Sequence, residues 1–74
     1  MVKLPNITGK ELSLALQKIG FDVKRIKGSH HFLKHNDGRI TVIPIHSGEN
    51  IGPGLLSKIL KDCDLTKEQL KELL

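Results

Sequence analysis

Apolar residues recur at helical spacing early in the chain. They are Leu12, Ala15, Leu16 and Ile19, three or four positions apart, which gives a helix one apolar face. Thr8 precedes this pattern and Glu11 stands three residues after Thr8, a spacing typical of a capping box. Gly20 can take the left-handed conformation that ends many helices. The pattern therefore predicts a helix that begins after Thr8 and ends at Gly20.

Three short segments with the composition of strands follow, separated by turns that contain glycine. The segments are residues 21–26, 29–35 and 39–45. Lys27-Gly28 is the expected first turn and Asp37-Gly38 the second, because glycine supplies the positive φ angle of a tight hairpin. Pro44 indicates an edge strand, since proline has no N–H to donate to a neighbouring strand. We expect a three-stranded antiparallel meander.

Two-residue turns would fix the pairing of these strands. Phe32 would lie beside Val23 and Ile43, and His30 beside Arg25 and Ile45. One face of the sheet would hold Phe21, Val23, Phe32, Ile43 and Ile45, with Arg25 and His30 toward one end. The other face would hold Ile26, His31, Leu33, Ile40 and Val42. A shift of one residue in either turn would exchange the faces. Helices can cover one face, and the second, with Leu33 and Val42, is a candidate protein interface.

The last third of the chain carries two further helix patterns. Pro53 suits a first helical turn, and an apolar stripe follows at Leu55, Leu56, Ile59 and Leu60. Thr66 and Gln69 form a second capping-box pattern before a short tail helix. The order is helix, three-stranded meander, helix and small helix, which predicts a two-layer α+β fold. Seventy-four residues are enough for one domain, residues 1–74.

The charge balance favours a nucleic-acid partner. Lysine and arginine number 12 against 8 acidic residues, a net charge of +4, and a basic surface attracts phosphates. The strand segments contain Lys24, Arg25, Lys27, Lys34 and Arg39. Charge alone also fits a domain that is basic only for solubility. With two phenylalanines as the only aromatic residues, a stacking platform for single-stranded bases is not expected.

The composition also bears on the compartment. Cys63 is the single cysteine, so no internal disulfide and no zinc-type cysteine spacing is possible. No apolar run approaches the length of a membrane span, and residues 1–5 lack the core of a signal peptide. We expect a cytoplasmic protein that does not contact a membrane.

Four histidines, at positions 30, 31, 35 and 46, are the candidates for chemistry. His31 and His35 would suit a metal on a helix, but on a strand they would stand about 13 Å apart and could not share one ion. His30 and His46 could approach across the sheet, yet no carboxylate or cysteine is placed to complete a site. No metal or other cofactor is expected.

His30 could instead act as a general acid or base. Imidazole can take and give a proton at cellular pH, and basic residues beside it would hold a phosphodiester. RNA supplies its own nucleophile, the 2′-hydroxyl, so no protein nucleophile is required. The residues alone favour a half-buried, hydrogen-bonded sheet histidine with no catalytic part.

An ordered set of motifs resembles the HicA (YcfA-like) family of mRNA interferase toxins. The set comprises Gly20-Phe21, Gly28-Ser29-His30, Asp37-Gly38, Val42 to Gly48, and a Gly-Pro-Gly-Leu helix start at residues 52–55. The resemblance implies a fold similar to the double-stranded RNA-binding domain, metal-independent cleavage of mRNA, and a HicB-type antitoxin as partner. It places the catalytic histidine at His30, in the motif with Gly28 and Ser29.

The resemblance also orders the remaining candidates. His46 matches a histidine that recurs in the loop after the third strand, with a role in hydrogen bonding or catalysis, whereas His31 and His35 match no functional position and are expected on the surface. The residues expected to contact phosphate are Lys24, Arg25, Lys27, Lys34 and Lys58. Arg25 is favoured among them because the expected pairing sets it opposite His30.

Two other functions remain compatible with the sequence. One is a non-catalytic RNA-binding module of the same fold that recognises shape and phosphates. The other is a protein-interaction domain whose basic charge is incidental, and it predicts no salt-dependent binding of RNA.

Overall fold

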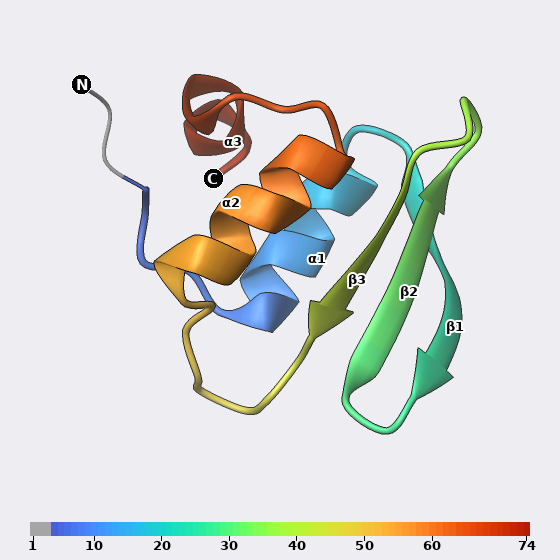
Figure 1. The fold of residues 1–74 in the computed structure, drawn as a ribbon, viewed down its shortest axis with the longest axis horizontal. Coiled ribbons are helices and arrows are strands. Elements are labelled where there is room, and N and C mark those ends of the chain that lie inside the picture. Colours follow the sequence, from blue (N-terminus) through green and yellow to red (C-terminus); the bar gives the residue numbers. More distant parts are fainter. Residues whose placement is uncertain (1–3) are drawn as a thin grey trace.

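The computed structural model describes residues 4–74 and has the expected α+β architecture. Its elements are α1 (Gly9–Gln17), β1 (Phe21–Lys27), β2 (His30–His35), β3 (Ile40–Pro44), α2 (Pro53–Asp62) and α3 (Lys67–Leu73). Figure 1 shows the helices on one side of the three-stranded sheet, with α1 and α2 side by side. This arrangement is consistent with a fold like the double-stranded RNA-binding domain. Residues 1–3 of the segment expected to lack a signal-peptide core lie outside the described residues.

Local capping signals define the ends of two helices as predicted. The Thr8 N–H donates to Glu11 Oε1 at 3.0 Å, and the Glu11 N–H donates to Thr8 Oγ1 at 3.2 Å. The Thr8 N–H and the Thr8 hydroxyl, 2.9 Å away, both donate to the Glu11 carboxylate, and these two hydrogen bonds lower the pKa of Glu11. Thr66 and Gln69 make the same reciprocal bonds at the start of α3. Gly20 has a φ of +101°, so the left-handed residue after α1 is also confirmed.

The strand order β1-β2-β3 is confirmed, but the expected pairing register is wrong. Phe32 pairs with Arg25 and Val42, and His30 pairs with Lys27 and Pro44. Two local features cause the difference. The first turn is Gly28-Ser29 instead of Lys27-Gly28, and the second loop has three residues, 36–38. The new turn moves the second half of β1 by two residues from the expected pairing, and a β-bulge at Lys24 reduces the difference to one residue in the first half.

The faces of the sheet differ accordingly from the expectation. Leu33 and Ile43 are fully buried and Thr41 nearly so, and they face the helices. Phe32 and Val42 are half-buried on the opposite face. The prediction that Leu33 lies on a free face for a partner is therefore wrong. Three loop residues in place of two move β3 by one position against β2, which exchanges the side chains that point toward the helices.

The hydrophobic core lies between the sheet and the helices. Its largest members include Phe21, Leu33 and Ile43 of the sheet, Leu12 and Leu16 of α1, Leu56 and Ile59 of α2, and Leu70 of α3. Leu55 of the predicted α2 stripe is 38% exposed. None of the helices between residues 4 and 74 is both long and apolar enough to cross a membrane.

His35 is part of the packing between the sheet and α1, and its expected place as a free surface residue is wrong. The Asp37 N–H donates to His35 Nδ1 at 3.1 Å, so Nε2 carries the proton and donates to the Ile19 carbonyl at 2.9 Å. The ring also packs edge-on against Phe21. Arg39 lies over the ring of Phe21, with its guanidinium carbon 5.1 Å from the ring centroid. These contacts fix the β2–β3 loop to the helical layer.

Candidate nucleic-acid interface

The sheet leaves one face free of helices, and the basic residues of the strands gather on it. We define the open face by the side chains that alternate with the buried ones and by their cross-strand partners. They are Asp22, Arg25 and Lys27 of β1, His30, Phe32 and Lys34 of β2, and Ile40, Val42 and Pro44 of β3. Figure 1 shows the helical layer on the other side of the sheet. The open face therefore combines apolar residues in its middle with cations around them.

The bulge in β1 determines which basic residues reach the open face. Val23 pairs with Leu33, a residue that faces the helices. In a regular strand Arg25 would lie on the same side as Val23, because side chains alternate with a period of two. Lys24 is the extra residue, and after it Arg25 pairs with Phe32 on the open face. One inserted residue thus moves two cations, Arg25 and Lys27, to the side of His30.

His30 lies at the first position of β2, directly after the turn, and is exposed. Gly28 has a φ of +59°, a conformation that favours glycine. The Ile45 N–H donates to the Ser29 carbonyl at 2.8 Å, which ties the segment before His46 to this turn. Gly28, Ser29 and His30 therefore lie at the end of the sheet where the chain leaves β3 toward His46.

The His30 ring is free for chemistry in a way that the His35 ring is not. Within residues 4–74, His35 is the histidine whose ring nitrogens are hydrogen-bonded to the protein. His31 follows His30 directly, but alternation turns it toward the helices, where it is half-buried and pairs with Ile43. The open face thus presents one histidine, at its edge, next to Lys27.

Arg25 does not lie opposite His30, so the reason for favouring it is wrong. Lys27 takes that place, and Arg25 pairs one row away with Phe32. The Arg25 guanidinium carbon is 5.9 Å from the centroid of the Phe32 ring, within the range of a cation–π contact. Both cations are exposed. Arg25 remains near His30, but its direct neighbour is an aromatic ring.

Lys24 and Lys34 meet at the other end of the sheet. Together with His35 and Asn36 they line a hollow of about 240 Å³. The Lys24 ammonium lies 4.0 Å from the Asp22 carboxylate, and both side chains are more than half exposed. Such a contact adds little stability, so both lysines can still attract an anion. The open face consequently has a positive site at each end, with Phe32 between them.

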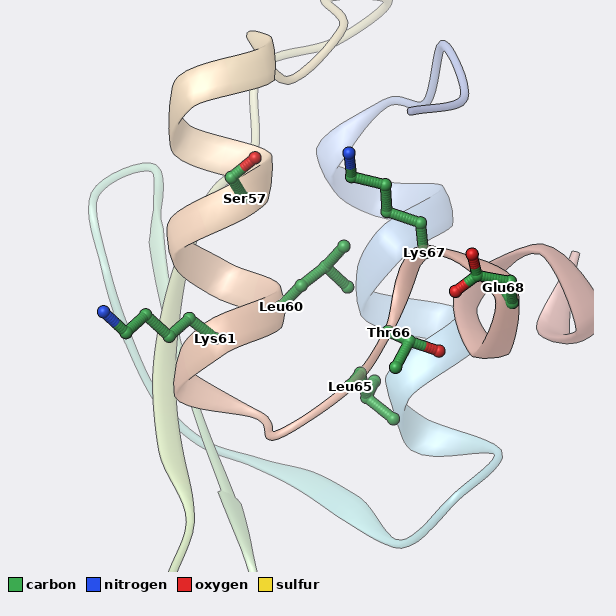
Figure 2. Close-up of a pocket in the computed structure, with 7 residues that line it drawn as sticks. All are labelled: Ser57, Leu60, Lys61, Leu65, Thr66, Lys67 and Glu68. Carbon is green, nitrogen blue, oxygen red and sulfur yellow. The ribbon is translucent and has the colours of Figure 1, made fainter. Parts of the chain in front are cut away.

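Lys58 is not brought together with the other predicted phosphate contacts. It lies on α2, on the helical side of the sheet, and its ammonium is 3.1 Å from the Asp62 carboxylate. A surface hollow of about 590 Å³ is also in the helical layer. Figure 2 shows it between α2, with Ser57, Leu60 and Lys61, and the segment from Leu65 to Glu68. Neither feature shares a surface with His30.

Candidate metal ligands do not cluster in the described part of the chain. Residues 4–74 contain no group of three or more histidine, cysteine, aspartate or glutamate side chains arranged to hold an ion. Cys63 is buried, and its burial raises the pKa of the thiol to about 11. The charged and aromatic groups on the open face are imidazole, ammonium, guanidinium, the Asp22 carboxylate and one aromatic ring.

A comparison with family models identifies the chain's relatives. The model described as the HicA toxin of bacterial toxin–antitoxin systems matches residues 9–65, well over half of the chain. The chain belongs to the HicA toxin family. No curated protein matches it. Membership implies an antitoxin partner in a toxin–antitoxin system, and the matched range includes all three strands, α2 and the open face.

Sequence reasoning missed Phe32 as a residue of the HicA-family chain's open face. It assigned Phe32 to the core with Phe21, whereas Leu33 takes that place. The signal that could have found it is the polarity of its neighbours on the same face. His30 and Lys34, the residues two positions before and after Phe32, are both polar and suit an exposed face. Leu33 shares its face with His31 and His35, and a histidine can make a hydrogen bond within the protein, as His35 does with Ile19.

Proposed function

We propose that this chain is an endoribonuclease that cleaves mRNA without a metal ion, with His30 as the general acid/base. The observation that carries the proposal is the position of His30. It is exposed beside Lys27, at the edge of a basic sheet face, in a chain of the HicA toxin family. A HicB-type antitoxin is the proposed partner, and the mRNA substrate places the proposed activity in the cytoplasm.

The chemistry requires little beyond these groups. Neutral His30 takes the proton of a 2′-hydroxyl, and the 2′-oxygen attacks the adjacent phosphorus. The bond from phosphorus to the 5′-oxygen breaks, which leaves a 2′,3′-cyclic phosphate and a 5′-hydroxyl. The proton that His30 gained returns to the leaving 5′-oxygen directly or through water. Lys27, paired across the strands with His30, and Arg25, one row away, stabilise the negative charge that develops on the phosphoryl oxygens.

The test is cleavage of a single-stranded RNA by the wild-type chain and by His30→Ala, each with and without EDTA. Removal of a general acid/base is expected to slow cleavage by about 10²- to 10⁴-fold, while RNA affinity stays nearly unchanged. The matched control is His31→Gln, because His31 is the adjacent histidine on the opposite face of β2. It should cleave at the wild-type rate if it is folded, which its far-UV circular dichroism reports.

Three results would contradict the proposal. Cleavage that EDTA abolishes would move the chemistry to a metal ion. Equal cleavage by wild type and His30→Ala would remove His30 from the mechanism. RNA binding without cleavage by any variant would favour the non-catalytic RNA-binding module.

A further inference from the structure

The middle of the open face has the geometry of a site for one unpaired base. Phe32 is half-buried in the central strand, and its ring has the Arg25 guanidinium 5.9 Å from its centroid. Aromatic rings and guanidinium planes are the groups on which proteins stack splayed bases of RNA. Val42 lies on the other side of Phe32 in the same row and supplies an apolar floor.

Phe32 stands between the two positive ends of the face. His30 and Lys34 are each two residues from it on the same strand and the same side, about 6.8 Å away at each step. This step is close to the length of one nucleotide in an extended single strand. A strand laid along β2 would therefore bring one phosphate to His30 and Lys27 and the next but one to Lys34 and Lys24, two nucleotide steps away.

We propose that the Phe32–Arg25 pair stacks one unpaired base of the substrate and so positions the adjoining phosphodiester at His30. The inference rests on the proposed function for the identity of the ligand, RNA. A base-paired duplex does not fit this site, because its bases are stacked inside the helix and cannot reach Phe32. The chain's composition allows only one such base, since its other phenylalanine, Phe21, is fully buried in the core.

The proposed stacking gives Phe32 and His30 different roles. Phe32 is a positioning residue, because it would hold the base and not touch the reacting atoms. Its loss should therefore weaken binding of single strands, while the loss of His30 should slow cleavage of RNA that is already bound. The two variants together separate the stacking proposal from the ribonuclease proposal.

The binding test uses a fluorescein-labelled 2′-O-methyl RNA about 12 nucleotides long, which lacks the nucleophile and stays intact, and the duplex of the same sequence. Phe32→Leu is expected to lower the affinity for the single strand by about 5- to 150-fold, the effect of one stacked base. Phe32→Tyr keeps a ring and should restore it. All three proteins should bind the duplex alike, as fluorescence anisotropy would show.

A second variant keeps the test decisive if Phe32→Leu does not fold. Arg25→Lys changes an exposed residue, keeps the charge and removes the planar guanidinium. It should weaken single-strand binding with an unchanged salt dependence. Wild-type single-strand affinity in folded Phe32→Leu would overturn the proposal, and if Phe32→Leu does not fold, wild-type single-strand affinity in Arg25→Lys would do so. So would unchanged RNA affinity with weakened binding of the antitoxin, which would assign the face to the protein partner. Loss of cleavage in His30→Ala leaves the stacking result untouched.

Discussion

Substitutions that each remove one positive charge should show, through their effect on RNA affinity, which surface of the chain binds RNA. Among residues 4–74, three cations of the open face make no salt bridge with a carboxylate, namely Arg25, Lys27 and Lys34, whereas Lys58 is paired with Asp62 on α2. Lys27→Gln and Lys58→Gln are therefore matched variants. Each removes one positive charge from an exposed position without shortening the side chain to alanine.

The expected magnitude follows from counterion release. Three phosphate contacts to a single strand give a slope of log K against log salt concentration of about −2, because each contact contributes about −0.7. Affinity should then fall about 20-fold between about 50 and 200 mM salt. Lys27→Gln should reduce the slope to about −1.4, a loss of about 7-fold over the same range. Lys58→Gln should keep the wild-type slope.

Fluorescence anisotropy with uncleavable 2′-O-methyl RNA at four salt concentrations measures these slopes. Equal changes in Lys27→Gln and Lys58→Gln would show that RNA contacts the helical layer as much as the open face. That result would refute the assignment of the interface and restore Lys58 as a phosphate contact. A wild-type slope near zero would refute RNA binding by charge altogether and favour a protein-interaction domain.

Three further predictions concern stability and reactivity. Leu33→Ala should lower the free energy of unfolding by about 2–5 kcal/mol, and Val42→Ala should lower it by clearly less, because Leu33 is fully buried and Val42 is half-buried. Equal midpoints of urea unfolding for the two variants would contradict this prediction. Cys63, with its thiol pKa raised to about 11, should react with a thiol reagent at neutral pH only after denaturation, and rapid native labelling would refute its burial. Hydrogen bonds from Arg39 lower the pKa of Asp37 in the folded chain. As the pH falls below about 4, the unfolded chain therefore binds more protons than the folded chain, and the stability that the Asp37–Arg39 contact contributes is lost. Melting temperatures of Asp37→Asn should depend less on pH there than those of wild type.

The helices could be predicted from the sequence because their signals are local. Thr8 with Glu11, and Thr66 with Gln69, satisfy helix-end N–H groups through residues three positions apart, so no distant contact is needed. The turn before His30 could also be located from the sequence, but only to within one residue, since it is Gly28-Ser29 and not Lys27-Gly28. Capping and turn chemistry act within a few residues, and a pattern of a few residues reports them.

The register of the sheet could not be predicted because it depends on distant packing. Phe32 and Leu33 are adjacent, both apolar, and either could face the helices; the choice rests on a loop of three residues and a bulge at Lys24. Neither has a distinct sequence signature here. The sequence therefore located His30 but gave Arg25 the wrong neighbour, and the expected partner face contained the buried Leu33.

The bulge at Lys24 has two consequences that favour a binding role for the open face. It interrupts β1, an edge strand, where bulges and lysines hinder pairing with another sheet. It also turns Arg25 and Lys27 outward and leaves Ile26 on the helical side, 60% exposed where the helices do not cover it. Without the bulge, alternation would turn Ile26 to the open face and Arg25 and Lys27 to the helical side. The arrangement is explained if the open face has to bind a polyanion.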